Sequence, residues 1–450
     1  METRVDEGSL DTLWRPFTQH ALHQKPLVIV KGQGCTLTDA EGKEYLDGMA
    51  GLWCVAVGYG QERLVEAAAR QMRELAYTPL SRPAPVALEA ARRLVSVLPK
   101  GLDHVQFLNS GSEAVETALK IARQYARQVY PKDNRYKVIA RYRGYHGWTL
   151  GTLGATGQAV RKVRFEPLLA GFLHVRPPDM FHLFAGVRPE EAARQLAQEL
   201  EETIQFEGPE TVAAFIGEPI IGGGGVIVPP DDYWPLIRQV CDKYGLLLIL
   251  DEVITGFGRT GRMFGCDNWG VVPDIMTMAK GIVSGYIPMA ATATTDRVFE
   301  AFLGEVAENR QFNQISTFGG HPVSCAVAIE NLSLFQELGL VENAARMGTR
   351  LGDGLLGLRS RHAVLGDVRG KGLIWGLELV QPGTREPLPS AQVRQVAAEA
   401  QRLGLLVGQN TATVPRLECV ITIAPPLIVN NEQVDRIVNT MDEALGSRKA

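Results

Sequence analysis

The sequence has few cysteines and no long apolar segment, and each absence excludes a class of protein. Its cysteines lack the paired spacing of a disulfide framework or a zinc site, so we expect free thiols. They are Cys35, Cys54, Cys241, Cys266, Cys325 and Cys419. No apolar run approaches the roughly 18 residues of a membrane-spanning helix. Residues 1–7 are polar and acidic, unlike a signal or transit peptide, so we expect a cytoplasmic protein.

An excess of charge of one sign is also absent. The 450 residues include 46 Lys and Arg against 50 Asp and Glu, which gives a net charge of −4. This balance gives no electrostatic support for nucleic acid or an anionic membrane as a partner. The shares of hydrophobic (45%) and charged (21%) residues are ordinary for a soluble globular protein, and the length allows two lobes.

Motifs for metals and nucleotides are missing or incomplete. No His-Glu-x-x-His motif or Cys/His cluster supports a catalytic metal, so we expect none. The four glycines at 222–225 lack the Lys and Ser/Thr that follow in a P-loop. Residues 256–261 match the dinucleotide pattern G-x-G-x-x-G, but they lie five residues beyond the preceding strand and no helix pattern follows. A nicotinamide oxidoreductase is therefore only an alternative.

Strand and helix patterns alternate through the middle of the chain, which indicates an α/β fold with a mainly parallel sheet. Strands are expected at 105–108, 136–141, 212–216 and 246–250, and helices at 113–129, around 192–200 and at 233–244. Further on, helices are expected at 324–338 and 341–358, and strands at 373–380 and 420–424. With short strands expected at 27–30 and 35–38, we predict a small domain of residues 1–60 and 330–450 and a large domain of residues 61–329.

Asp251 and Lys280 carry the clearest chemical signal. Five apolar residues at 246–250 end at Asp251, which indicates a buried strand with a carboxylate at its C-terminal end, where ligands lie in open α/β sheets. This carboxylate could hold a proton on a heterocyclic cofactor nitrogen, and Lys280, 29 positions later, could react with a cofactor aldehyde. The pair suggests pyridoxal 5′-phosphate (PLP). A structural aspartate and a surface lysine are the alternative.

Two further motifs fit a phosphate group and a flat ring. Residues 109–114 join a strand to a helix, and the small residues Gly111 and Ser112 there let main-chain N–H groups approach an anion. An ordinary serine N-cap is the alternative. Tyr145 follows a strand and could stack on a cofactor ring, although many such tyrosines are core residues. We interpret the adjacent His146 as a hydrogen-bonded structural histidine.

Six motifs, in their order along the chain, resemble those of class III aminotransferases, which are PLP-dependent enzymes of fold type I. The motifs are Asn109-Ser110-Gly111-Ser112-Glu113-Ala114, Tyr145-His146-Gly147, Gly217-Glu218-Pro219, the run DEVITGFGRTG at 251–261, Ala279-Lys280-Gly281 and Ser316-Thr317-Phe318-Gly319-Gly320-His321-Pro322. The resemblance covers nearly the whole chain. It implies a large domain with a mainly parallel seven-stranded sheet flanked by helices, and a smaller α+β domain built from both termini.

The resemblance implies roles around the cofactor ring. Lys280 would hold the cofactor as a Schiff base and shuttle protons, and Asp251 would pair with the pyridinium nitrogen. Tyr145 and Val253 would lie on the two sides of the ring. Glu218 would not touch the cofactor itself but would contact the residues that do.

The resemblance also implies contacts to the phosphate. Gly111 and Ser112 would bind it from the same subunit. Thr317 would reach it from the second subunit of a homodimer whose active site lies at the interface. Assembly beyond the dimer, to a tetramer, is left open.

On the substrate side, the sequence is similar to omega-amino acid and amine:pyruvate aminotransferases. Residues 51–60 resemble the segment that lines their amine pocket, where Trp53, together with Tyr145, would contact the substrate. Trp148 stands where relatives that use 2-oxoglutarate carry arginine, which favours pyruvate as the acceptor. Arg416 resembles a mobile arginine that pairs with a carboxylate and swings away for apolar amines. A core tryptophan and a surface arginine are the alternatives.

We therefore expect a transaminase that moves an amino group from an amine donor to pyruvate, a keto-acid acceptor, by a ping-pong mechanism. The donor would be an omega-amino acid or amine of the β-alanine, taurine, putrescine or aryl-alkyl amine type. Related alternatives are a diaminopelargonate-forming aminotransferase, a glutamate-semialdehyde aminomutase and a dialkylglycine decarboxylase. A catalytically inactive binding protein with this fold is disfavoured because Asp251 and Lys280 are both present.

Overall fold

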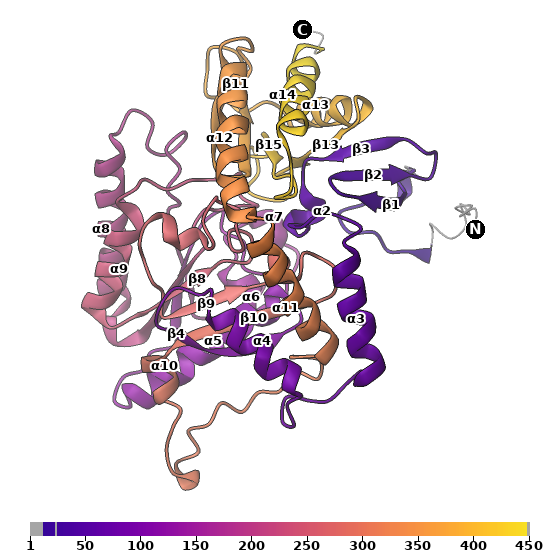
Figure 1. The fold of residues 1–450 in the computed structure, drawn as a ribbon. Coiled ribbons are helices and arrows are strands. Elements are labelled where there is room, and N and C mark those ends of the chain that lie inside the picture. Colours follow the sequence, from indigo (N-terminus) through magenta and orange to yellow (C-terminus); the bar gives the residue numbers. More distant parts are fainter. Residues whose placement is uncertain (1–11, 23–24, 448–450) are drawn as a thin grey trace.

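A seven-stranded sheet forms the centre of the computed structural model, which describes residues 12–22 and 25–447 (Figure 1). The strand order is β4-β10-β9-β8-β7-β5-β6. β10 runs antiparallel to both neighbours and the other pairs are parallel, which confirms the expected mainly parallel sheet. The strands are β4 (Leu102–Leu108), β5 (Lys137–Arg141), β6 (Phe172–Val175), β7 (Val212–Gly217), β8 (Leu247–Asp251), β9 (Ile275–Met278) and β10 (Ala290–Thr295). The polar start at 1–7 lies outside the described residues.

Helices cover both faces of this sheet, which explains why its central strands are apolar throughout. In β8, Leu247 and Ile249 pack into one hydrophobic cluster, and Leu248 and Leu250 pack into another. The helix α5 (Gly111–Val129) contributes to the first cluster. The helices α8 (Pro189–Glu207) and α9 (Tyr233–Tyr244) contribute to the second. An apolar run buried on both faces is the signal of a central parallel strand.

The other helices next to this sheet are short or lie at its edges. They are α3 (Glu62–Glu74), α4 (Pro85–Val95), α6 (Leu150–Ala155), α7 (Ala159–Lys162), α10 (Asp296–Glu300) and α11 (Pro322–Glu337), with 3-10 turns η2 (Pro209–Thr211), η3 (Gly265–Asn268), η4 (Lys280–Val283) and η5 (Val306–Glu308). α11 packs on α3 and α4 and spans position 330. The division of the chain at 60 and 330 therefore stays a prediction, and its second boundary falls inside a helix.

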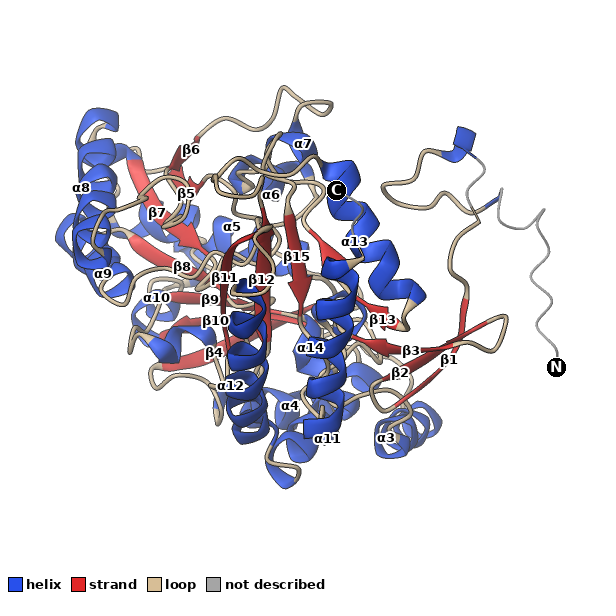
Figure 2. Cartoon of the chain, turned by 90° about the horizontal axis from the view of Figure 1, so that it is seen from above, coloured by secondary structure: helices blue, strands red, loops and turns tan. Residues whose placement is uncertain are grey.

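The C-terminal part forms a separate antiparallel sheet, β11-β12-β15-β14, with α12, α13 and α14 beside it (Figure 2). The strands are β11 (Leu365–Lys371), β12 (Ile374–Leu379), β14 (Gly408–Gln409) and β15 (Val420–Ile423). The helices are α12 (Leu340–Arg359), α13 (Ser390–Arg402) and α14 (Asn431–Gly446). The expected helices and strands of this part are confirmed, with bounds that differ by a few residues.

The N-terminal strands pair with the C-terminal part of the chain. β1 (Ile29–Gln33), β2 (Thr36–Asp39) and β3 (Glu44–Asp47) form a meander, and β13 (Leu405–Leu406) adds to β3 in parallel. η1 (His20–Leu22) precedes this sheet, and the kinked α2 (Ala50–Trp53) follows it. This pairing supports the prediction that both termini build one small domain.

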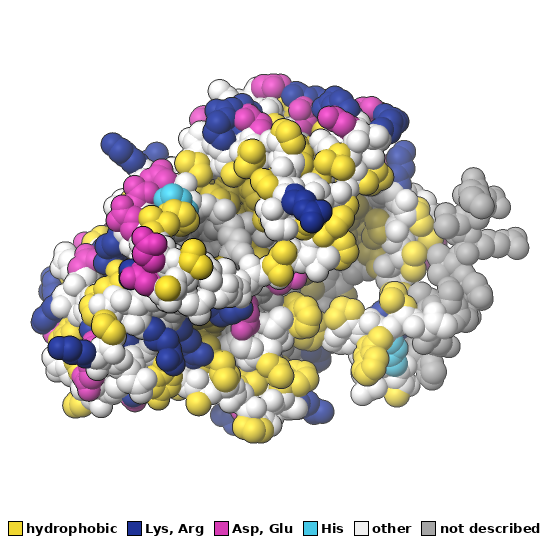
Figure 3. Space-filling view, turned by 90° about the horizontal axis from the view of Figure 1, so that it is seen from below, with side chains coloured by type: hydrophobic (Ala, Val, Ile, Leu, Met, Phe, Trp, Pro, Cys, Tyr) yellow, Lys and Arg dark blue, Asp and Glu magenta, His cyan; other side chains and the backbone are white. Residues whose placement is uncertain are grey.

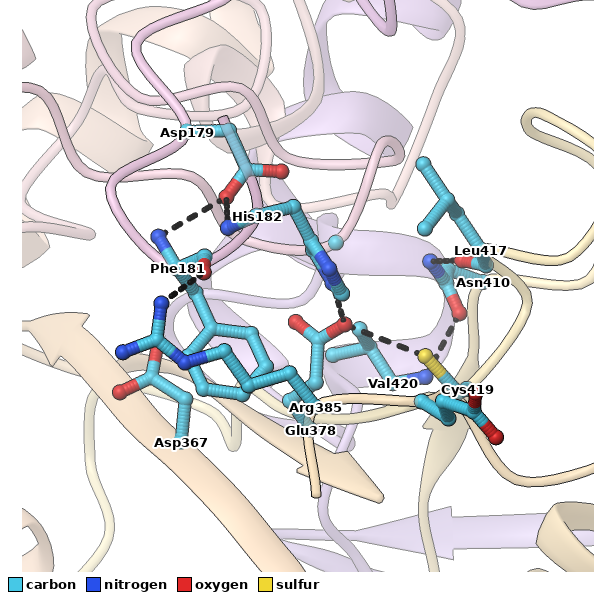
Figure 4. Close-up of polar contacts among 12 residues, drawn as sticks. Asp179, Phe181, His182, Asp367, Glu378, Arg385, Asn410, Leu417, Cys419 and Val420 are labelled. Atoms are coloured by element: carbon cyan, nitrogen blue, oxygen red, sulfur yellow. Dashed lines mark hydrogen bonds and ion pairs between the residues drawn. The ribbon is translucent and has the colours of Figure 1, made fainter. Parts of the chain in front are cut away.

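A buried ionic cluster ties β12 to the loop before α8 (Figure 4). The His182 Nε2 and the Glu378 Oε1 are 2.5 Å apart, and the Arg369 Nη1 lies 2.6 Å from the Glu378 Oε2. The Cys419 thiol lies 3.1 Å from the Glu378 Oε1. The loop at 177–189 begins with buried residues, and within it Asp179 accepts main-chain N–H groups and pairs with Arg143.

The expectations about cysteines and membranes can be compared with the described part of the chain. All six cysteines have free thiols. Within residues 12–22 and 25–447, no helix combines the length and the hydropathy needed to cross a bilayer. In the same residues, no group of three or more His, Cys, Asp or Glu side chains has an arrangement that could hold a metal ion.

Candidate active site

The residues singled out by the sequence lie where the strands of the large sheet end. Asp251 is the last residue of β8, Glu218 follows β7, and Lys280 follows β9 by two residues. Ser110 caps the helix after β4, and Tyr145 lies four residues beyond β5. At this edge of the sheet, the loops that follow neighbouring strands diverge and leave a crevice between them. Open α/β sheets bind their ligands in such a crevice.

Asp251 is buried and held in one orientation from three sides. Its Oδ2 lies 2.8 Å from the His146 Nδ1. Its Oδ1 accepts hydrogen bonds from the Val253 N–H and from the Thr277 hydroxyl, both at 3.2 Å. These contacts fix the carboxylate while the group still lines the cavity. The histidine expected to be structural is therefore hydrogen-bonded, as predicted, and its partner is the aspartate of the site.

Lys280 begins the short turn η4 and is partly buried. Burial lowers the pKa of its amine, an effect that the nearby Cys54, Asp251 and Glu218 oppose. A lowered pKa keeps a larger fraction of the amine neutral at physiological pH. A neutral amine is the form that can act as a nucleophile or accept a proton.

Glu218 is buried, and no cationic side chain among the described residues bonds to its carboxylate. Its Oε1 accepts the Tyr145 N–H at 2.9 Å, and its Oε2 accepts the Gly222 N–H at 2.9 Å. Burial raises the pKa of this carboxyl, and the neighbouring Asp251 adds to the shift, while His146 opposes it. Glu218 therefore fastens the loop that carries the Tyr145 ring.

The N-terminal end of α5 forms the opposite wall of the site. Ser110 caps the helix by accepting the Glu113 N–H at 3.2 Å. Ser112 is buried, and its hydroxyl accepts the Trp148 N–H at 3.2 Å. A Cβ atom at Gly111 would lie 3.1 Å from a methyl group of Val253, so glycine here avoids a tight contact with that side chain. Free N–H groups and the positive end of the helix dipole make such a helix start suitable for an anion.

These groups line one cavity of about 160 Å³. It contains every residue that we predicted for the cofactor except Thr317. Its lining consists of Ser110, Gly111, Ser112, Val115, Tyr145, His146, Gly147, Trp148, Glu218, Asp251, Val253, Ile254, Ala279 and Lys280. A carboxylate, an amine, an aromatic ring and a helix start thus face one space, which suits a flat, heterocyclic, phosphorylated ligand with a carbonyl group.

The structure does not bring the remaining predicted residues into this cavity. Trp53 is buried in the hydrophobic core, in a left-handed conformation with φ 63°. Arg416 is exposed on the loop between β14 and β15, with φ 71°. Thr317 is exposed on the long segment between η5 and α11, where its carbonyl accepts the Tyr77 hydroxyl at 2.8 Å.

Three contributors to the site were not predicted as such. His146 is the partner of Asp251, and Thr277 supports the same carboxylate from β9. Arg161 lies over the Tyr145 ring, with its guanidinium carbon 4.6 Å from the ring centre. The Tyr145-His146-Gly147 motif was a signal for the first, but nothing local in the sequence indicates the other two.

The glycine pattern at 256–261 belongs to a turn that continues from β8, as the sequence predicted. No helix follows it, and the next element is the short turn η3. Arg259 within the pattern is buried and donates to the carbonyls of Leu373 and Pro425, at 3.0 and 2.5 Å. The turn therefore contacts the C-terminal part of the protein, which argues against a dinucleotide site.

Comparison with known proteins agrees with this geometry. Residues 17–445 match the family model of class III aminotransferases. The chain is 40% identical over 435 residues to the taurine–pyruvate aminotransferase of Bilophila wadsworthia, which covers 96% of this chain and 94% of that protein. It is 38% identical over 442 residues to the putrescine–pyruvate aminotransferase of Pseudomonas aeruginosa, and the alignment covers 97% of this chain and 94% of that protein. The chain therefore belongs to the class III aminotransferases.

A solved structure supports both the fold and the cofactor. The crystal structure of an amine transaminase from an uncultivated Pseudomonas species, in its PLP-bound form, is similar with a TM-score of 0.92 and 38% identity, over 96% of this chain and 98% of that chain. As a class III aminotransferase, the enzyme uses PLP. The cavity fits this cofactor, because Lys280, Asp251 and the start of α5 offer partners for its aldehyde, its ring nitrogen and its phosphate.

Proposed function

We propose that the enzyme moves an amino group from an omega-amino acid or an amine to pyruvate by a ping-pong mechanism. The single observation that carries the chemistry is the cavity shared by the Lys280 amine and the Asp251 carboxylate. The relatives named for taurine, putrescine and pyruvate support the substrate class. Donors of the β-alanine, taurine, putrescine or aryl-alkyl amine type fit this class.

The roles of the site residues follow from their protonation and contacts. When bound, PLP supplies an electron sink for the substrate carbon that loses its proton. The Lys280 Nζ accepts that proton and later delivers it, which the lowered pKa of the amine favours. Asp251, fixed by His146 and Thr277, stabilises a positive charge on the ring nitrogen.

The walls of the cavity support roles for the remaining predicted cofactor residues. Tyr145 and Val253 line it and would hold the ring between them, while Glu218 keeps Tyr145 in place. Gly111 and Ser112 would bind the phosphate at the start of α5. Each assignment rests on position in one cavity and on suitable chemistry.

Trp148 supports pyruvate as the acceptor. It lines the cavity, and most of its side chain is exposed. An indole at this position presents no positive charge for the second carboxylate of 2-oxoglutarate. The shorter acceptor, pyruvate, needs a single carboxylate contact, for which we propose Arg416, with Trp53 near the amine. A guanidinium suits this task because it can bind a carboxylate with two hydrogen bonds.

We further propose a homodimer, with Thr317 reaching the phosphate of the partner's cofactor. Several large hydrophobic side chains are exposed, among them Leu52, Ile315, Phe318 and Trp148, of which Trp148 also lines the cavity. Figure 3 shows several hydrophobic patches on the face of the molecule seen from below. Apolar surface of this kind is commonly covered by a partner. We also propose that the enzyme works in the cytoplasm, which the free thiols of its six cysteines support.

The proposal is tested by the visible spectrum of the purified enzyme with PLP. β-Alanine, taurine, putrescine and 1-phenylethylamine are added separately, followed by pyruvate. We expect one of these amines to remove the yellow band of the bound cofactor and pyruvate to restore it, whereas 2-oxoglutarate restores it poorly. A protein that develops no yellow band even with added PLP would contradict the cofactor assignment. A band that no amine removes would contradict the proposed donors.

A further inference from the structure

The turn that carries Lys280 has an unusual main-chain conformation. Lys280 at its start and Ser284 at its end both lie in the left-handed region, with φ of 47° and 49°. Left-handed backbone is uncommon for residues other than glycine, since the Cβ atom approaches the neighbouring carbonyl oxygen. Such conformations persist only where surrounding contacts fix them, and they concentrate at functional sites.

One buried side chain, Asn331 of α11, holds this turn. Its Nδ2 donates to the carbonyls of Gly281 and Ile282, at 2.9 and 3.0 Å. Its Oδ1 accepts the hydroxyl of Ser284 at 2.7 Å. Asn331 and Ser284 are fully buried, so water cannot replace these bonds. The amide of Asn331 therefore bonds to Gly281 and Ile282, which lie between the two left-handed residues, and to Ser284, the second of them.

The same turn is fastened to the segment that carries Trp53. The Val57 N–H donates to the Ser284 hydroxyl at 3.3 Å. The Tyr286 hydroxyl donates to the Gly58 carbonyl at 2.8 Å and accepts the Gln61 N–H at 2.7 Å. Asn331 thus lies at the centre of a network that joins the turn, α11 and the loop before α3.

We propose that Asn331 is a positioning residue for the proton transfers of Lys280. It does not line the cavity and makes no hydrogen bond to the lysine side chain, and it acts by fixing the left-handed start of the turn from which the lysine extends. Without the amide, the Ile282 carbonyl loses its donor and the Gly281 carbonyl keeps only the Ser284 N–H at 3.4 Å, and the turn relaxes toward a less strained conformation. The inference rests on the proposed role of Lys280 as the proton carrier.

This role predicts a particular kinetic signature. Proton transfer requires the Nζ to lie within hydrogen-bonding reach of the reacting carbon, and a displacement of about 1 Å can cost about a hundredfold in rate. Binding of the amine donor depends on the pocket walls and does not require this alignment. Loss of the Asn331 amide should therefore slow the proton-transfer step and leave donor saturation nearly unchanged.

The experiment compares Asn331→Ala with Asn343→Ala as a matched control. Asn343 has the same chemistry, since its Nδ2 donates to the carbonyls of Leu427 and Val429, but it lies on α12, outside the lining of the cavity. The rate of the amine half-reaction is measured by the loss of the yellow band. Donors with hydrogen or deuterium on the carbon that bears the amino group give the isotope effect, and absorbance gives the cofactor content.

For Asn331→Ala we expect at least a tenfold slower half-reaction, a larger isotope effect and a half-saturating donor concentration within about threefold of the wild type. Asn343→Ala should leave the rate and the isotope effect unchanged. A rate within twofold of wild type would overturn the proposal, as would a slower rate with an unchanged isotope effect. So would a loss of rate that merely matches a loss of cofactor.

A second variant covers the case in which Asn331→Ala does not fold. Ser284→Ala removes two hydrogen bonds of the network, those of its hydroxyl with the Asn331 amide and with the Val57 N–H, and keeps both bonds from Asn331 to the carbonyls. It should raise the isotope effect in the same direction with a smaller loss of rate, and an unchanged isotope effect would count against the proposal. Failure of the proposed function is distinguishable, because it would appear as retained turnover in Lys280→Ala.

Discussion

The protein contains two groups of buried ionisable residues that differ in how their charges are compensated. In the cluster at β12, burial alone would raise the pKa of Glu378, but Arg369 and His182 hold it below its usual range. In the cofactor cavity, burial raises the pKa of Glu218 and lowers that of Lys280. Compensated charges stabilise one arrangement, whereas uncompensated ones retain the capacity to exchange protons. We propose that this difference separates the structural group at β12 from the catalytic group in the cavity.

The largest expected effect comes from removing the amine of the cavity. Lys280→Ala should lower transamination by at least about 10⁴-fold, because no other amine lines the cavity in the described residues. The fold should stay intact, since the lysine side chain makes no hydrogen bond or ion pair with any residue that the structure describes. Steady-state turnover and circular dichroism measure the two properties. Lys132→Ala, on the exposed turn after α5, is the control, and near-normal turnover in Lys280→Ala would sink the assignment.

Asp251→Asn should have the next largest effect. The amide keeps the shape of the carboxylate but removes the charge that stabilises the cationic ring nitrogen, so we expect a loss of about 10² to 10³-fold in the amine half-reaction. Glu218→Gln is the matched comparison. Since the raised pKa of Glu218 favours its neutral form, its replacement by an amide should cost less. An equal or larger loss in Glu218→Gln would break the proposed ranking of the two carboxylates.

Glu378→Gln should affect stability and leave chemistry unchanged. Removing one partner of a buried ion pair costs about 3 kcal/mol or more. Because the folded-state pKa lies below the ordinary value of 4.5, the charge stabilises the fold above about pH 4.5 and this contribution is lost as the pH falls. The difference in unfolding midpoint between wild type and variant should therefore be large at pH 7.5 and smaller near pH 4.

The control for this stability measurement is Asp435→Asn. Asp435 pairs with Arg350 at 2.7 Å, but both side chains are about half exposed. Exposed pairs contribute little, so the unfolding midpoint should not change measurably. If Glu378→Gln instead lowered the half-reaction rate at unchanged stability, the two buried groups would not differ in the way proposed.

The sequence predicted four of the seven strands of the large sheet, β4, β5, β7 and β8, because these strands carry their own signal. The apolar runs at 212–216 and 246–250 are buried on both faces, as their composition required. β6, β9 and β10 were not predicted, because β6 and β9 have only four residues each and the alanines and threonines of β10 have no clear pattern. β13 has only two residues. Short strands of this kind form through pairing with distant partners.

In the candidate site, too, some features carry a local signal in the sequence and others depend on residues far apart in the chain. Motifs at strand ends predicted which residues meet, because the carboxyl ends of neighbouring parallel strands share one edge. The contact of His146 with Asp251 depends on the order of the strands, in which β7 separates β5 from β8. The burial of Trp53 and the exposure of Arg416 depend on tertiary packing that no local pattern encodes.

Arg416 differs from the preorganised groups of the cavity, because its side chain is exposed although the main chain of its loop is hydrogen-bonded on both sides of it. The Asn410 Nδ2 donates to the Leu417 carbonyl at 2.8 Å, and the Val420 N–H donates to the Asn410 Oδ1 at 2.9 Å (Figure 4). Between these points, the Val160 N–H donates to the Thr413 carbonyl at 3.1 Å. The arginine side chain itself extends from an exposed position. This arrangement suits a group that approaches only some substrates.

Arg416→Ala should therefore produce the smallest and most selective loss. We expect kcat/KM to fall about 10 to 100-fold for β-alanine and pyruvate, whose carboxylates would lose a two-bond partner, and to change little for the half-reaction with 1-phenylethylamine. Arg394→Ala, on the exposed face of α13, controls for the loss of a positive charge. Equal losses for substrates with and without a carboxylate would mean that Arg416 acts on the fold of its loop. No loss with either class would assign the carboxylate contact to another residue and leave the Lys280 chemistry untouched.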